Sequence, residues 1–230
     1  MDDAAAFDRY AEAYDEALQA GLRVTGEGKD YYAARRIALL GALVGRQGAG
    51  PVARVLDYGC GDGDAAPLLR DVLGAREVVG VDPSAGMRAR AAARHPWATF
   101  APVEALPALG PFDLAYCNGV LHHVAPAARP GVVRAVREAL RPGALFGLWE
   151  NNPWNPGTRW VMRRVAFDAD AIPLAPPEAR ALLRAAGFTL LRTDHRFIFP
   201  AVLAALRPLE RWVTRLPLGG QYQVLARRPA

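Results

Sequence analysis

The chain contains 230 residues, of which 52% are hydrophobic, so it is long enough for one large domain with a complete core. No apolar run approaches the length needed to cross a bilayer, which excludes an integral membrane protein. The formal net charge is +5, but the arginines are scattered among acidic residues without a basic run, so the charge does not favour a nucleic-acid partner.

The first 46 residues predict two helices, because apolar side chains recur there at spacings of three and four residues. The first helix carries Phe7 and Tyr14, and the second carries Ile37 and Leu40. The opening sequence MDDAAAF is acidic where a secretory signal would be basic. We therefore expect a cytoplasmic protein that begins with a helical segment over residues 1–46.

After the loop GRQGAGP, short apolar runs alternate with helix-like segments. The runs are ARVLDY, EVVGVD, ATFAPV, FDLAYCN and ALFGLWEN. Between them lie DAAPLLRDVLG, AGMRARAAARH and RPGVVRAVREALRPG. This alternation predicts an α/β domain with a mainly parallel sheet, and right-handed crossovers make it a doubly wound, Rossmann-like sheet with helices on both faces.

The regular alternation lapses at Asn151, where prolines and tryptophans interrupt the pattern. We expect residues 151–175 to form an insert over the sheet, followed by a helix, a strand, an amphipathic helix over 200–216 and a last strand. These strands complete a predicted seven-stranded sheet within one domain over 47–230. The helix over 200–216 has one apolar face, which is expected to pack on the sheet or a partner subunit, or else to contact a membrane or a lipid substrate.

A glycine-rich turn, RVLDYGCGDGD, follows the first predicted strand. Gly59 and Gly61 match the start of a dinucleotide-binding G-x-G-x-x-G motif, but Asp64 replaces its third glycine, and no lysine is present for a phosphate-binding loop. A carboxylate about 4 Å from a phosphate oxygen costs about 4 kcal/mol at an effective dielectric near 20. Asp57, Asp62 and Asp64 therefore predict a ligand that is positively charged here.

Asp82 ends the second predicted strand, in VVGVDPS. A carboxylate at this place accepts hydrogen bonds from the two hydroxyls of a ribose. The two strand ends together predict a site for a nucleoside with a cationic tail that lacks phosphate. S-adenosylmethionine (SAM) fits this description.

Three motifs, VLDYGCGDG, VGVDPSAGM and FDLAYCNGVLHHV, resemble in this order the class I SAM-dependent methyltransferases. The resemblance extends from about Phe7 to Gly147, and FDRYAEAYDEAL resembles the lid helix of members that act on small molecules. It implies SAM as the cofactor, S-adenosyl-L-homocysteine as the product, and a small-molecule O, N or C acceptor such as a natural product, sugar or quinone-like metabolite. The residues that it implies for SAM binding are Tyr14, Arg36, Asp57, Gly59, Cys60, Gly61, Asp82, Pro83, Met87, Val103, Glu104 and Asn118.

One position departs from the family pattern. Members often read GDAEALP after the third strand, where the aspartate accepts a hydrogen bond from the adenine amino group. Here the sequence is APVEALP, with Pro102 at that position. The adenine contact is therefore expected from Val103 and Glu104.

Two adjacent histidines, His122 and His123, follow the fourth predicted strand. Histidine titrates near neutral pH and can remove a proton from a hydroxyl or an amine, so both are candidate bases. The alternative is that one of them packs against or caps the following helix. No third histidine, cysteine or acid stands at metal-ligand spacing, so no metal site is predicted.

The remaining polar and aromatic candidates allow two interpretations each. Cys60 and Cys117 follow strands that are neighbours in this family, and two buried thiols are expected. Trp154, Trp160 and the arginines at 159, 163 and 164 form either an acceptor pocket or the insert's own core and solvated face.

The sequence is also compatible with other functions and with more than one oligomeric state. The sequence CNGVLHH lacks the signature of methyltransferases that act on the amino groups of DNA bases, so a nucleic-acid substrate is disfavoured. An NAD(P)-dependent oxidoreductase and a non-catalytic SAM-binding protein are the alternative functions, and either a monomer or a homodimer is compatible with the sequence.

Overall fold

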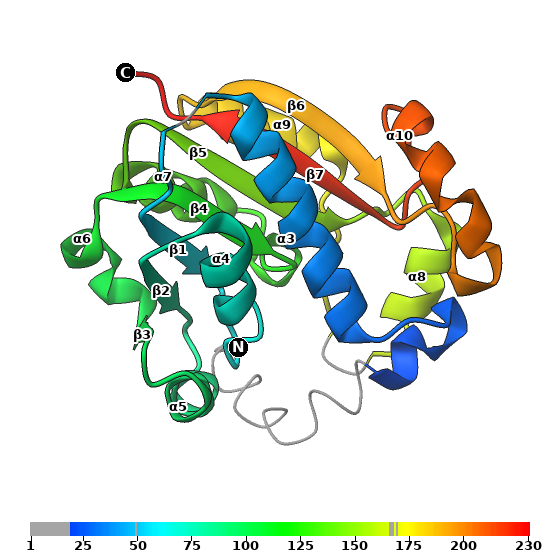
Figure 1. The fold of residues 1–230 in the computed structure, drawn as a ribbon, viewed down its shortest axis with the longest axis horizontal. Helices are drawn as coiled ribbons and strands as arrows, with labels where there is room; N and C mark the ends of the chain where they lie inside the picture. The colour runs from blue at the N-terminus through cyan, green and yellow to red at the C-terminus, as the bar shows by residue number, and fades with distance from the viewer. Residues whose placement is uncertain (1–18, 49, 166–167, 169) are drawn as a thin grey trace.

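The computed structural model describes residues 19–48, 50–165, 168 and 170–230. Seven strands form one sheet in the order β3-β2-β1-β4-β5-β7-β6 (Figure 1). The strands are β1 (Arg54–Tyr58), β2 (Glu77–Val81), β3 (Thr99–Ala101), β4 (Phe112–Asn118), β5 (Leu140–Asn151), β6 (Thr189–Arg196) and β7 (Gln221–Arg227). The first five are parallel, and β7 lies antiparallel between β5 and β6. The predicted α/β fold with a mainly parallel seven-stranded sheet is confirmed.

Helices cover both faces of this sheet (Figure 1). Their bounds are η1 (Arg23–Thr25), α3 (Lys29–Arg46), α4 (Ala66–Leu73), α5 (Ala85–Arg94), η2 (Val103–Ala105), α6 (Leu106–Leu109), η3 (Leu121–His123), α7 (Arg129–Ala139), α8 (Pro156–Met162), α9 (Pro176–Ala185), η5 (Ala201–Leu209) and α10 (Glu210–Val213). None of the helices in the described part of the chain combines the length and apolarity needed to cross a bilayer.

Two apolar clusters hold the layers together. On one face, Ile37 and Leu40 of α3 pack with Leu69 of α4 and with side chains of β1 and β5. On the other face, Val133 of α7 and Leu183 of α9 join a second buried cluster. Burial of such side chains contributes about 1.5–3 kcal/mol each. The helix α3 is thus part of the core, and its first turn and exposed side also reach the site described below.

The glycine turn lies where β1, β2 and β4 end at the same edge of the sheet. Gly59 adopts a positive φ of 73°, and an added Cβ would lie 2.3 Å from Val120 Cγ2, so only glycine fits there. The amides of Gly59 and Cys60 donate to Val81 O at 2.8 and 3.1 Å. These bonds hold the turn against the end of β2, at the crevice where doubly wound sheets bind ligands.

The predicted α-helix over 200–216 is wrong in type. The chain instead forms a 3₁₀ helix, η5, and then one short α-helical turn, α10. Pro208 has no N–H to donate in an α-helix, and Leu203 departs from helical angles with φ −110° and ψ 24°. The apolar side chains of this segment therefore follow a repeat of three residues, which changes the face that they share.

Candidate functional site

Asp57, at the end of β1, is a buried carboxylate whose Oδ2 has no hydrogen-bond partner among the described residues. Burial, followed by the nearby charges of Asp82 and Asp64, raises the pKa of Asp57 to about 7. A buried carboxylate oxygen without a hydrogen-bond partner lowers the stability of the free protein. A ligand that donates a hydrogen bond to this oxygen removes that cost. Gly61 lies in the same turn, and no atom is within 4 Å of the place where its Cβ would be. The turn can therefore receive a cationic group.

The other two carboxylates of the turn are paired with basic side chains. Asp62 accepts from Arg94 at 2.5 Å, and Asp64 accepts from Arg94 and Lys29, each at 2.6 Å. The prediction that three acids repel a phosphate is therefore corrected, because α3 and α5 bring cations onto the turn. The case for a positively charged ligand depends on Asp57 alone.

Asp82 joins the turn to the start of α5. Its Oδ2 accepts from the amide of Gly61, and its Oδ1 accepts from the amide of Ser84, both at 2.9 Å. Each carboxylate oxygen has a second lone pair, so Asp82 can still accept from a ligand hydroxyl. The Ser84 hydroxyl accepts from the amide of Met87 at 3.1 Å and caps α5.

The predicted adenine-binding residues lie along the ends of β2 and β3. Pro83 is exposed and Met87 is buried at the start of α5, whereas Val103 is half-buried and Glu104 is exposed in η2. Cys60 and Cys117 are both buried and unoxidised, as expected, and burial raises the pKa of each thiol. The binding roles of this group stay predictions.

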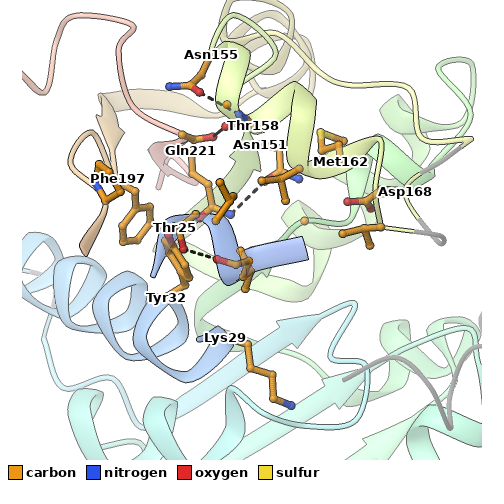
Figure 2. A pocket seen from close by; sticks show the side chains of 18 of the residues that line it. Thr25, Lys29, Tyr32, Asn151, Asn155, Thr158, Met162, Asp168, Phe197 and Gln221 are labelled. Carbon is orange, nitrogen blue, oxygen red and sulfur yellow. Dashed lines mark hydrogen bonds between the residues drawn. The ribbon is translucent and has the colours of Figure 1, made fainter. Parts of the chain in front are cut away.

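A cavity of about 430 Å³ adjoins the ends of β4 and β5, and Figure 2 shows side chains that line it. It is walled by α3, η3, α8 and the segment after β6. Labelled residues from these parts are Lys29, Tyr32, Asn151, Asn155, Thr158, Met162, Asp168, Phe197 and Gln221. A concave site of this volume, apolar on one side with convergent polar groups on another, suits a small molecule.

Arg36 and Asn118 lie where this cavity meets the sheet. Arg36 donates to Tyr116 Oη at 3.3 Å and to Gln221 Oε1 at 3.1 Å. Asn118 Oδ1 is buried and has no hydrogen-bond partner among the described residues. Like Asp57 Oδ2, it can accept a hydrogen bond from a bound ligand. Tyr14, predicted to cover the cofactor, lies outside the described residues.

His122 is buried between two carboxylates. Its Nδ1 lies 2.6 Å from Glu150 Oε2, and its Nε2 lies 3.5 Å from Asp168 Oδ1. Burial disfavours the charged ring, but Glu150 and Asp168 outweigh it and raise the pKa of His122 to about 10. Glu150 also accepts from the amide of Leu121 at 2.7 Å. His122 is therefore a charged, structurally held ring at neutral pH.

His123 lines the same cavity, with Nε2 3.3 Å from Asp168 Oδ1. Desolvation disfavours the ionised form of Asp168, but hydrogen bonds from both histidines outweigh this and lower its pKa. One donor atom each from His122, His123 and Asp168 lies within 4.8 Å of the others, close enough to hold a metal ion. The expectation that no acid stands near the histidines is thus corrected, because folding brings Asp168 to them.

The residues of the insert that line the cavity differ from the candidates that the sequence suggested. Trp154 and Trp160 are 51% and 42% exposed, and Arg159 is exposed on α8. The side chains of α8 that line the cavity are instead those of Thr158 and Met162, together with Val161. Asn155 caps α8 by accepting from the amide of Thr158 at 3.0 Å, and this N-cap sequence, Asn-Pro-Gly-Thr, is the signal that could have placed the helix.

A family model described as a methyltransferase domain matches residues 27–201. Trans-aconitate 2-methyltransferase of Variovorax paradoxus is 31% identical over 182 residues, which cover 76% of this chain and 56% of that protein. The enzyme of the same name from Methylobacterium nodulans is 33% identical over 140 residues, covering 58% of this chain and 49% of that one. The chain thus spans about half the length of these curated relatives.

Solved structures of similar fold include an S-adenosylmethionine-dependent methyltransferase from Mesorhizobium loti, with 25% identity and a TM-score of 0.58 over 83% of this chain and 98% of that chain. A TehB-like SAM-dependent methyltransferase from Corynebacterium glutamicum has 18% identity and a TM-score of 0.62 over 96% and 99%. The second likeness, at its low identity, concerns the fold.

Proposed function

The chain belongs to the class I SAM-dependent methyltransferases, and from this premise we propose that it methylates a small molecule bound in the cavity beside η3. One arrangement carries the proposal: His123 lines the cavity with Asp168 at 3.3 Å, next to Asn118 at the end of β4. In this proposal, His123 is the proton acceptor and SAM lies beside it, at the ends of β1 and β4. SAM as the cofactor also sets aside the NAD(P)-dependent alternative.

The residues around the glycine turn fit SAM. Asp57 Oδ2 and Asn118 Oδ1, both buried without a partner among the described residues, would accept from the ammonium of the methionyl part. Gly59, Cys60 and Gly61 would pass beneath it, and Arg36 would meet its carboxylate. Asp82 would accept from the ribose hydroxyls. The contacts of Tyr14, Pro83, Met87, Val103 and Glu104 with SAM stay part of this proposal.

SAM supplies a methyl group on a positively charged sulfur, which leaves as a neutral thioether. His123 would take the proton of the acceptor's hydroxyl or amine when that oxygen or nitrogen is methylated. Asp168 Oδ1, 3.3 Å from Nε2, would hold the His123 ring in place and stabilise it once it has taken the proton. The proton then passes from His123 to solvent.

Small carboxylic acids are a second acceptor class. The two curated relatives described above are both named trans-aconitate 2-methyltransferase, and trans-aconitate is a small carboxylic acid. A carboxylate oxygen is already deprotonated, so its methylation needs positioning more than a base. The two classes are therefore separable by the effect of removing His123.

Radiolabelled methyl transfer tests the function directly. Purified protein is incubated with labelled SAM and matched sets of small alcohols, amines and carboxylic acids, with trans-aconitate among the last. We expect transfer to a hydroxyl or amine of a molecule small enough for a 430 Å³ cavity. Transfer to none of the three sets, with SAM bound, would contradict these acceptor classes and leave a carbon acceptor or the non-catalytic alternative. Repeating the assay with a chelator reports whether the group of His122, His123 and Asp168 holds a metal that activity needs.

The pH dependence of cofactor binding follows from Asp57. Its pKa in the free protein is about 7, and an ammonium ligand favours the ionised form. We therefore expect the Kd of S-adenosylhomocysteine to fall about tenfold per pH unit as the pH rises from about 5 towards 7. Titration calorimetry across this range measures it. Asp57→Asn should bind more weakly with a flat profile, and equal slopes for both proteins would contradict the assignment.

A further inference from the structure

The segment formed by η5 and α10 has no buried residue along its whole length, from Ala201 to Val213. Figure 1 shows it at the periphery of the fold, beyond the end of β6. Several of its large apolar side chains are exposed to an unusual degree, with Val202 at 88% and Trp212 at 71%. Isolated exposed apolar residues are ordinary, whereas a continuous group of them marks an interaction surface.

The 3₁₀ geometry arranges these side chains in a row. Leu203, at the kink of η5, is followed at the same spacing by Leu206 and Leu209, which share one edge because residues three apart in a 3₁₀ helix lie above one another. They are 44%, 39% and 50% exposed, and Trp212 continues the spacing into α10. We call these four residues the apolar row. An α-helix with the same sequence would spread them around its axis.

A group of arginines borders the apolar row. Arg35, Arg196, Arg207 and Arg211 line a second cavity of about 250 Å³ beneath η5. We call these four residues the arginine pocket.

Only part of that positive charge is used within the described chain. Arg207 pairs with Glu27 at 2.6 Å, and Arg196 lies 3.5 Å from Asp194. Glu210 also lines this cavity, and its carboxylate accepts from the backbone amides of Ile198 and Phe199. Arg35 is exposed and has no partner among the described residues, and Arg211 lies over the ring of Trp212 at 4.6 Å. The pocket therefore keeps an excess of positive charge.

We propose that the apolar row and the arginine pocket together dock the protein on an anionic lipid bilayer. An interfacial segment inserts apolar side chains at the level of the headgroups while neighbouring basic residues attract anionic lipids, and this segment has both parts. The pocket has room for a lipid phosphate. The proposal concerns attachment of the whole protein and does not depend on which acceptor is methylated.

Charge favours the bilayer over a second copy of the chain. A symmetric dimer built on this surface would bring the same patch of both subunits together. The arginine pockets would then face each other or lie side by side. Like charges brought together oppose such a contact, whereas an anionic surface complements them.

The segment also leads directly into the candidate active site. Phe199 and Pro200, immediately before η5, line the 430 Å³ cavity. Tyr31 and Phe197 line both cavities and form the wall between them. A protein docked through η5 and α10 would therefore hold this cavity close to the lipid surface.

Co-sedimentation of the full chain with vesicles tests the proposal. We expect binding to phosphatidylcholine vesicles that contain phosphatidylglycerol, little binding to phosphatidylcholine alone, and release at high salt. Arg35→Gln with Arg211→Gln should weaken partitioning on the order of 25-fold, from about fivefold for each charge near the surface. Leu206→Asp should abolish it.

Matched controls change comparable residues elsewhere. Val72→Asp on α4 replaces another exposed apolar side chain, and Arg134→Gln on α7 removes another exposed positive charge. Both should partition like the unchanged protein. All of the altered residues are exposed, and unchanged melting temperatures verify that the variants fold.

Three results would overturn the proposal. One is failure to bind anionic vesicles at low salt. Another is a dimer in analytical ultracentrifugation that Leu206→Asp dissociates, because the surface would then belong to a second copy of the chain. Vesicle binding unchanged by Leu206→Asp would likewise place the membrane contact elsewhere.

Discussion

His123→Ala is expected to lower kcat by about two to four powers of ten at saturating acceptor, which is the usual contribution of a positioned general base. The acceptor would then have to lose its proton to water. The Kd for SAM should stay within about twofold, since no proposed SAM contact involves this ring. Single-turnover methyl transfer together with calorimetry separates the two quantities.

Asp168→Asn provides the companion measurement. Asparagine keeps the shape of the side chain but removes the negative charge 3.3 Å from Nε2 of His123, so we expect a smaller loss of kcat than for His123→Ala, together with a shifted pH profile. His122→Ala is unsuitable as a control, because it would leave Glu150 buried without its partner at a cost of about 3–5 kcal/mol of stability. Full turnover of His123→Ala would remove the base from the mechanism and favour an acceptor that arrives deprotonated.

Asp82→Ala is expected to raise the Kd for SAM on the order of 100-fold, from the loss of about 3 kcal/mol in charge-assisted hydrogen bonds to the ribose. The same carboxylate accepts from the amides of Gly61 and Ser84, so part of the loss arises from a loosened turn. Calorimetry with SAM and S-adenosylhomocysteine measures the total effect.

Two further variants separate the contribution of the ribose hydrogen bonds from that of the loosened turn. Asp82→Asn retains a carbonyl oxygen and the shape of the side chain, so it should bind SAM with intermediate affinity. Ser84→Ala removes the cap of α5, with an expected cost of about 1 kcal/mol in stability and little change in SAM affinity. If Asp82→Ala binds SAM as tightly as the unchanged protein, the ribose assignment is wrong.

Local patterns in the sequence determined the architecture. Short apolar runs alternating with helical periods predict a doubly wound sheet, because strands buried on both faces and amphipathic helices each impose their own spacing. The glycine turn was likewise readable, since the positive φ values at Gly59 and Gly61 restrict the residue type at those positions. Because this turn follows the first strand, its place in the chain also indicates the crevice where a doubly wound sheet binds its ligand.

The pairing of charged groups was decided only by the tertiary structure. Lys29 and Arg94 neutralise Asp64 and Asp62, although helices far from the turn in sequence supply them. Asp57 is thereby singled out as the buried acid that can meet a cation. Charge counted along the chain has no information about which opposite charge lies within hydrogen-bonding distance.

The partners of the two histidines and the geometry of η5 were likewise decided only by the tertiary structure. Glu150 and Asp168 reach His122 and His123 through the long β5 strand and the insert, so no spacing in the sequence marks them as partners. In η5, Pro208 and the kink at Leu203 interrupt the α-helical pattern, and no residue of the segment is buried. Periodicity and turn chemistry act over a few residues and are written in the sequence, whereas contacts between distant segments exist only once the chain has folded.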